Sequence, residues 1–292
     1  MSVSMLASQL LVGLSRGMIY FIVAAGLTLV FGVLRVINFT HGSFYMLGAF
    51  IGYSVAAGIG HGSAGFWLML VLAPLAVAGI SLLVERGFLQ FVYRREHLIQ
   101  VLLTYALVLI AGDLVKFFWG SQYRSLSTPP IFTGSFATGS ITVPKYNVFL
   151  LLVGPLVALG LWLFLSHTRF GKICRATATD REMVDILGVN STWIFAAVFA
   201  LGGWLAGLGG ALMAPVVNIS LGMDANTIIY AFLIVVVGGL GNIWGALISS
   251  LIIGVGEAFG ALFMPDWAVV LPYIITGVLL ILRPSGLLKS VW

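Results

Sequence analysis

Charged side chains are scarce in this sequence. Only 8% of its 292 residues are Asp, Glu, Lys or Arg, whereas 61% are hydrophobic. A soluble domain usually carries about 25% charged residues, because its surface faces water. So few charges cannot cover a water-facing surface, and the composition therefore predicts an integral membrane protein in a lipid bilayer.

The sequence is equally poor in residues that carry chemistry. Its one cysteine, Cys174, permits no intramolecular disulfide and offers no cysteine cluster for a metal. The glycine-rich phosphate-binding loop, the serine nucleophile elbow and the paired histidines of zinc proteases are all missing. The four histidines stand at the ends of apolar segments; they are His41, His61, His97 and His167. We therefore expect no catalytic residue, no metal site and no cofactor.

Long apolar segments, by contrast, are abundant. A helix needs about 20 apolar residues to cross about 30 Å of hydrocarbon. Eight segments have about that length: 17–34, 42–58, 65–84, 98–118, 148–166, 191–213, 243–262 and 267–283. We predict an all-α polytopic transmembrane bundle, a single transmembrane domain over 1–292, with eight or nine spans.

A further apolar run, 225–239, is shorter than the roughly 20 residues that a membrane-spanning helix needs. As a helix it would rise only about 22 Å. It is either a short span or a re-entrant half-helix that ends at Gly238, Gly239 and Gly241. The predicted fold therefore includes Gly-interrupted or re-entrant helices.

The basic residues predict the sidedness of the chain. The net charge is +5, and Lys and Arg gather in the 85–97 loop, the 167–190 loop and the C-terminal tail. Basic loops are typically cytoplasmic, so the N-terminus should lie outside. The C-terminus is cytoplasmic only if 225–239 crosses; a re-entrant segment would leave Arg283 outside. No basic stripe with interleaved aromatics favours nucleic acid as a partner.

Two polar loops stand out. The outer loop 119–147 is rich in Ser, Thr, Gly and Pro, and it is either a linker or a docking surface for an external partner. In the 167–190 loop, Thr179 or Asp180 can cap a short helix that runs to about Leu187 and ends at Gly188. That loop is either an ordinary basic surface loop or a knob that inserts into a cytoplasmic motor subunit.

Three polar residues interrupt the apolar runs. Glu257 lies within 243–262, where a carboxylate is costly unless it faces a cavity or a partner. It either lines or gates a pathway, or it makes a structural hydrogen bond between helices. Asn38 and His41 separate the first two spans, and they either cap a helix end or line an unwound site.

The segments 36–56 and 233–256 share a pattern that suggests an internal repeat. Each begins with an apolar stretch, continues with a polar or glycine-rich stretch and ends with a second apolar stretch. Paired interruptions of this kind point to a transport site, although chance similarity in a chain with 36 glycines is an equal alternative.

Three motifs in order resemble one known family. The run GLTLVFGVLRVINFTHGSFYMLGAF (26–50), the loop TRFGKICRATATDREMVDILGVN (168–190) and the stretch VVVGGLGNIWGALISSLIIGVGEAF (235–259) are similar to signatures of permease subunits of branched-chain amino-acid ABC importers. The resemblance covers about residues 10–288. The departures at Thr40, Ser43 and Asn242 leave the substrate open among branched-chain and other amino acids, urea, short amides and sugars.

The resemblance implies a set of partners. They are a second homologous permease, two cytoplasmic ABC ATPase subunits that bind the ATP, and a periplasmic substrate-binding protein. It places the chain in the bacterial cytoplasmic membrane.

It also implies roles for particular residues. It assigns the coupling to the ATPase to Arg169, Gly171, Arg175, Ala176, Asp180 and Gly188, and we add Glu182 from the same loop. For the translocation pathway we select Asn38, His41, Tyr45, Gly239, Asn242 and Glu257.

Two other functional classes compete with this interpretation. A self-sufficient secondary transporter or channel would use Glu257 and His41 as ion or proton groups. An intramembrane enzyme would need the same two residues within hydrogen-bond reach of each other.

Overall fold

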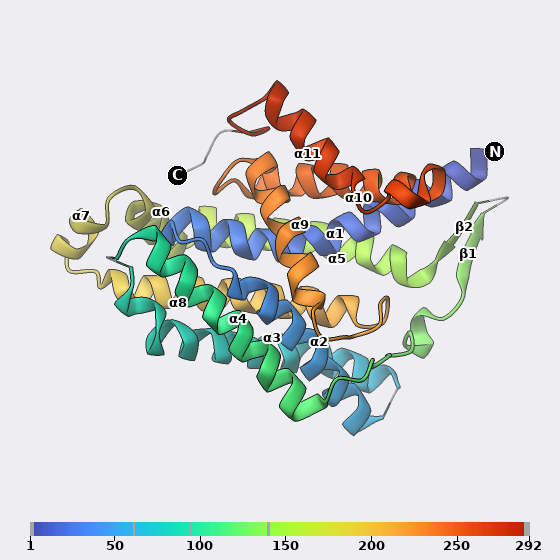
Figure 1. Cartoon of the computed structure of the whole chain (residues 1–292), viewed down its shortest axis with the longest axis horizontal. Helices are drawn as coiled ribbons and strands as arrows, with labels where there is room; N and C mark the ends of the chain where they lie inside the picture. The colour runs from blue at the N-terminus through green and yellow to red at the C-terminus, as the bar shows by residue number, and fades with distance from the viewer. Residues whose placement is uncertain (1–2, 61, 94, 139–140, 289–292) are drawn as a thin grey trace.

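The computed structural model describes residues 3–60, 62–93, 95–138 and 141–288. His61, Arg94 and Lys289 lie outside these ranges. Within them the α-helices are α1 (Val3–Leu34), α2 (Thr40–Ile59), α3 (Ser63–Gly87), α4 (His97–Trp119), α5 (Lys145–His167), α6 (Arg169–Thr179), α7 (Arg181–Ile186), α8 (Ser191–Met213), α9 (Met223–Gly238), α10 (Ile243–Phe263) and α11 (Leu271–Leu282). Short 3-10 turns occur at Leu89–Phe91, Pro130–Phe132 and Pro265–Trp267. Figure 1 shows the helices gathered into one bundle.

Seven of these helices are long and apolar enough to cross a membrane: α1, α2, α3 with its following turn, α4, α5, α8 and α10. The all-α prediction is therefore confirmed. Helices α9 and α11 have 16 and 12 residues, which rise about 24 and 18 Å. The expected full-length span at 267–283 is wrong, because a 3-10 turn precedes a short helix with Pro272 in its first turn. The total of eight or nine spans stays a prediction.

Helix α1 begins far earlier than the predicted span at residue 17. Arg16 interrupts the apolar run in the sequence, but the helix continues through it to Val3. In the structure the Arg16 guanidinium lies 3.3 Å from the carboxylate of Glu257 in α10. A charge that has a partner on a neighbouring helix need not end a helix in the membrane.

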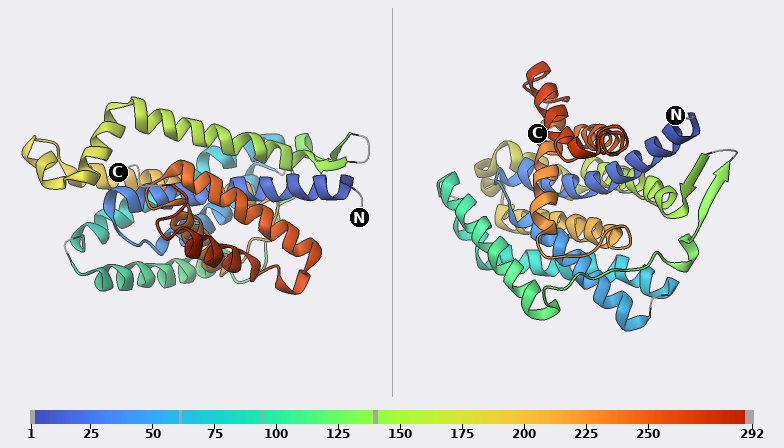
Figure 2. Two further views of the ribbon diagram at one scale, coloured as in Figure 1. Left: turned by 90° about the horizontal axis from the view of Figure 1, so that it is seen from above. Right: turned by 45° about the vertical axis from the view of Figure 1, so that its right-hand side comes forward.

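The loop 119–147 has regular secondary structure. It contains the antiparallel hairpin β1 (Ser135–Thr138) and β2 (Ile141–Pro144), in which Phe136 pairs with Val143. Pro144 ends the second strand and directly precedes α5. Seen from above, α5 runs along one edge of the bundle from this hairpin toward α6 (Figure 2).

Helix α8 and helix α1 form the centre of the bundle, and most of each apolar window is buried. Small residues bring the neighbouring backbones very close to α8. A Cβ built at Gly210 would collide with the carbonyl of Tyr45 in α2, and one at Gly203 with Ser81 in α3. Close approach of this kind is how helices associate in lipid, where burial of apolar surface gives no extra driving force.

The loops sort into two ends of the bundle. At the end that holds α6, the Arg35 guanidinium donates to the Ala178 carbonyl at 3.0 Å, and Gly241 shares a small pocket with Arg175. At the opposite end, Arg124 forms an isolated β-bridge with Ile219. Helix α9 therefore connects the two ends, and it crosses α1 and α10 at a steep angle (Figure 1).

The last described residues form a strap across the end of α9. The Leu287 N–H donates to the Val237 carbonyl at 2.7 Å, and the Leu288 N–H donates to the Gly238 carbonyl at 3.3 Å. These carbonyls lie in the last turn of α9 and have no partner within the helix. The strap satisfies them and brings the C-terminal segment to the same end of the bundle as α6.

Replacing Gly48 with alanine should destabilise the bundle. A Cβ at Gly48 would collide with the backbone of Gly207 in α8, and overpacking of this kind costs about 1–3 kcal/mol. Thermal unfolding in detergent should show a lower midpoint. The matched control is Gly58→Ala in the same helix, where nothing lies within 4 Å of the new Cβ. Equal midpoints for the two variants would contradict the close contact between α2 and α8.

Candidate functional site

A polar cavity of about 330 Å³ lies between α1, α2, α9 and the α8–α9 loop. Its polar lining residues are Tyr20, Tyr45, Asn218, Ser220, Asn226, Thr227 and Tyr230. Polar side chains in a membrane bundle are costly unless they face water or a partner. A cluster of them around one cavity is therefore the best candidate for a functional site in the described residues.

The first turns of α9 build one wall of this cavity. Gly222 adopts φ 86°, a left-handed conformation that suits glycine, and it turns the chain into the helix. The Thr227 hydroxyl donates to the Met223 carbonyl at 2.9 Å, and it also hydrogen-bonds to Tyr45 across the cavity. The wall is thus tied to α2 through one hydroxyl pair.

The other wall is fixed by a carboxylate. Glu257 accepts a hydrogen bond from the Tyr20 hydroxyl at 2.7 Å and lies 3.3 Å from the Arg16 guanidinium. The rings of Tyr20 and Tyr230 lie 5.3 Å apart at their centroids. Glu257 therefore joins α10 to α1, as the structural alternative in the sequence analysis expects. The Glu257 side chain does not line the cavity itself. It holds the lining residue Tyr20 in place through their hydrogen bond.

The first helix break lies deeper in the bundle. His41 is fully buried, and its Nε2 lies 2.8 Å from the Val23 carbonyl. The side chain of Asn38 is also buried and has no hydrogen-bond partner in the described part of the chain. The expectation that Asn38 caps α2 is wrong, because Phe39 holds the cap position and no side chain bonds there.

The second break lies at the α6 end. Gly239 has φ 97°, and a Cβ there would collide with the carbonyl of Leu288 in the strap. The Asn242 side chain accepts from the Gly245 N–H at 3.0 Å and so caps α10. Both residues have structural tasks at this turn, and neither lines the polar cavity.

The six residues selected for a pathway thus fall into three places. Tyr45 lines the cavity, Glu257 holds a lining residue, and the other four lie at the two helix breaks. Their role in transport stays a prediction. His41 and Glu257 have different partners and do not bond to each other, so the structure does not bring together the acid–base pair that an intramembrane enzyme would need.

The segment 167–190 contains two helices where the sequence analysis expects one. The predicted short helix is confirmed as α7: the Asp180 side chain accepts from the Met183 N–H at 3.0 Å, and Gly188 ends it with φ 83°. Helix α6 was not predicted. Thr168 caps it by accepting from the Gly171 N–H at 3.1 Å.

Helix α6 packs tightly under the end of α5. A Cβ at Gly171 would collide with the Leu165 carbonyl, to which the Arg175 guanidinium also donates. Arg175 is half-buried and Gly171 is buried, so both hold the segment in place. The rest of the predicted coupling set is exposed: Arg169, Ala176, Asp180, Glu182 and Gly188.

Helix α7 forms the tip of this end of the bundle (Figure 1). Three apolar side chains at this tip face outward: Met183 and Ile186 in α7 and Leu187 directly after it, the last two 79% and 74% exposed. Exposed apolar clusters with a polar rim typically mark an interaction surface. The sequence analysis left open whether these three side chains are exposed or tucked under the bundle, and the structure shows them exposed.

Several residues of the site were missed in the sequence. Tyr20, Asn226 and Thr227 line the cavity, although no motif singles them out. Asp224 is buried in the first turn of α9 and accepts a hydrogen bond from Ser43 at 3.3 Å. Arg16 could have revealed part of the site from the sequence. It is a basic residue within one apolar run, and Glu257 is an acidic residue within another, so the two could have been expected to pair.

Comparison with known proteins gives a consistent result. The profile of the family described as "Branched-chain amino acid transport system / permease component" matches residues 9–282. The branched-chain amino acid transport permease BraD of Pseudomonas aeruginosa is 31% identical over 96% of this chain and 94% of its own. LivH of Escherichia coli K12 is 30% identical over the same shares. The fructose import permease FrcC of Rhizobium meliloti is 32% identical, but over only 42% of this chain and 35% of its own. No solved structure matches the chain.

The thiol of Cys174 should be almost inert. It is buried in α6, and burial raises its pKa to about 12. At pH 7.5 the thiolate, which is the reactive form, should be about a thousandfold rarer than for an ordinary cysteine. Labelling with a membrane-permeant maleimide should therefore be at least that much slower than for Ala176→Cys in a Cys174→Ser background, since Ala176 is exposed on the same helix. Comparable labelling rates would show that α6 is not packed as described.

Proposed function

Because the chain belongs to the family of branched-chain amino acid transport system permease components, we propose that it forms half of the membrane pathway of an ABC importer in the bacterial cytoplasmic membrane. It moves branched-chain or other amino acids into the cell, and separate ATPase subunits bind and hydrolyse the ATP. The observation that carries this proposal is the polar cavity between α1, α2 and α9. It is a water-compatible hollow within a largely apolar bundle.

The end that holds α6 and α7 is the cytoplasmic end in this proposal. Its described loops and helices hold Arg35, Arg86, Arg95, Arg169, Lys172, Arg175, Arg181 and Arg283. The loops of the opposite end hold far fewer, mainly Arg124 and Lys145. By the positive-inside rule the N-terminus is outside. The C-terminus is cytoplasmic, because the strap binds α9 beside the α9–α10 turn.

Helix α7 is the proposed contact with an ATPase subunit. Its exposed apolar side chains need a partner, and the carboxylates of Asp180 and Glu182 beside them suit a basic rim on that partner. Since α7 continues directly from α6, movement of the ATPase acts on α6. The Arg35–Ala178 hydrogen bond then links α6 to the junction between α1 and α2, and both of those helices line the cavity.

A second homologous permease completes the pathway. The cavity lies between α1, α2 and α9 of this chain, and Asn226 on α9 is exposed. A polar wall of this kind needs either water or a facing subunit. At the outer end, the hairpin β1–β2 in the 119–147 loop is the proposed surface for a periplasmic substrate-binding protein.

The substrate class rests on the relatives. Full-length similarity to BraD and LivH favours branched-chain amino acids, while the partial similarity to FrcC keeps sugars as the second candidate, with urea and short amides as further members of the wider group. A self-sufficient secondary transporter is the alternative class. Uptake into liposomes by this chain alone, without any ATPase, would establish that alternative.

Placing a charge on the exposed face of α7 should uncouple the importer. Ile186→Asp and Leu187→Asp each put a carboxylate into the proposed apolar contact, and losing one central contact residue costs about 2 kcal/mol or more. We expect ATPase copurification to weaken by about tenfold or more, with the permease still in the membrane. Ile131→Asp is the control, since Ile131 is an exposed apolar residue in the 119–147 loop. Unchanged ATPase binding in both α7 variants would argue against this contact.

Filling the cavity should block transport without disturbing assembly. Asn226→Trp adds a bulky ring to a lining position, and raising the transport barrier by about 1.4 kcal/mol slows uptake about tenfold. Ile229→Trp is the matched control on the same helix, because Ile229 is exposed and does not line the cavity. Uptake of labelled leucine, urea and ribose in a deletion strain measures both the block and the substrate class. Wild-type uptake by an assembled Asn226→Trp complex would remove this cavity from the pathway.

A further inference from the structure

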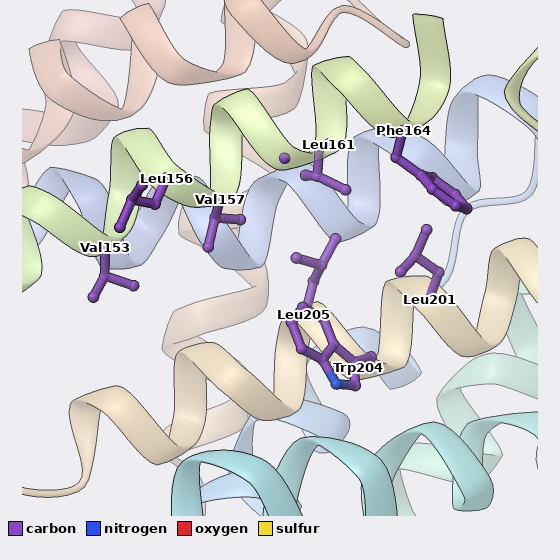
Figure 3. A pocket seen from close by; sticks show the side chains of 9 residues that line it. Val153, Leu156, Val157, Leu161, Phe164, Leu201, Trp204 and Leu205 are labelled. Carbon is purple, nitrogen blue, oxygen red and sulfur yellow. The ribbon is translucent and has the colours of Figure 1, made fainter. Parts of the chain in front are cut away.

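A second, entirely different hollow lies between α5 and α8. It is a groove of about 390 Å³, and Figure 3 shows the side chains of both helices pointing into it. Every lining residue is apolar: Val153, Leu156, Val157, Gly160, Leu161, Phe164, Leu201, Trp204 and Leu205. From Val153 to Phe164 the groove extends about 16 Å along α5.

The groove exists because α5 and α8 each pack on α1 and meet each other directly at Tyr146, whose hydroxyl donates to the Leu212 carbonyl at 2.6 Å. A Cβ at Gly154 of α5 would collide with Met18 of α1, and one at Gly202 of α8 would collide with Val30 of α1. Both helices are thus fixed to the same central helix on either side. Gly160 then leaves the space between them empty, since nothing lies within 4 Å of its Cβ position.

The end of the groove toward α6 meets a basic surface. The ring of Phe164 lies 5.4 Å from the ring of Phe170 in α6, and Phe170 follows Arg169 directly. Arg169 and Lys172 are exposed, and neither forms an ion pair among the described residues. Helix α6 has apolar residues on one face and these cations on the other, which is the pattern of a helix at a membrane interface.

We propose that this groove binds one acyl chain of an anionic phospholipid, with the phosphate of the headgroup against Arg169 and Lys172. Unpaired basic side chains at the mouth of an apolar groove between membrane helices suit an anionic headgroup. A narrow apolar groove of about 390 Å³ that extends about 16 Å suits one flexible acyl chain.

Photocrosslinking in lipid nanodiscs tests this site. The probes are phosphatidylglycerol with a diazirine in the middle of one acyl chain and phosphatidylcholine with the same chain. Phosphatidylglycerol should label peptides from 153–164 and 201–205 in preference to other lipid-facing segments. Gly160→Phe fills the groove and should abolish that labelling. Gly112→Phe in α4 is the matched control, because its Cβ position is also free.

The headgroup contact is tested separately by surface substitutions that leave the groove intact. Arg169→Gln and Lys172→Gln should each lower the preference for phosphatidylglycerol over phosphatidylcholine about fivefold, since one basic residue near an anionic lipid contributes about 1 kcal/mol. Equal labelling by the two lipids in the unmodified protein would overturn the proposal. So would labelling that survives Gly160→Phe.

The remaining possibility is a second copy of a permease over the groove. Gly160→Cys in a Cys174→Ser background carries one cysteine, which points into the groove. The proposal predicts no disulfide-linked dimer after oxidation in the assembled complex. A dimer linked through residue 160 would show that protein covers the groove, and it would overturn the lipid site.

Discussion

The structure depends on backbone contact between α8 and the helices around it. In lipid, apolar side chains gain nothing from leaving the solvent, so helices associate through close packing. Gly203, Gly207 and Gly210 give α8 three positions where a neighbouring backbone or short side chain fits directly against it. The same constraint fixes α1 and α2 beside α8. Because these two helices also line the polar cavity, the geometry of that cavity follows from the glycine contacts.

Charged side chains have different roles inside the bundle and at its α6 end. Inside the bundle, Glu257 and Arg16 are paired across α10 and α1, and Tyr20 shares the carboxylate. At the α6 end, most of the described cations are exposed, and in the proposed function they set the orientation of the chain and its contacts with other molecules. The first arrangement supports the wall of the cavity. In the two proposals above, the second leaves one face of α6 to the lipid and the tip of α7 to a protein partner.

The sequence predicted the class of fold and several details well, because they depend on local patterns. Apolar runs gave the long helices, and Asp180 with Gly188 gave the two ends of α7. It could not predict which polar residues meet, because Tyr20, Tyr45 and Thr227 come from three helices and carry no local signal. The predicted span began at residue 17, whereas α1 continues through Arg16 to Val3, because the partner of Arg16 lies near the other end of the chain. Helix α6 was missed although its sequence is amphipathic, with apolar residues on one face and Arg169 and Lys172 on the other.

The C-terminal strap has a consequence for how α10 and α11 are held. Leu287 and Leu288 supply the hydrogen bonds that the last turn of α9 lacks, and about fifty residues separate them from Val237 and Gly238 along the chain. The strap therefore closes a long loop that contains both α10 and α11. Without the two leucines, that loop would be attached to the end of α9 on one side only, and two carbonyls at the α9–α10 turn would lose their hydrogen bonds.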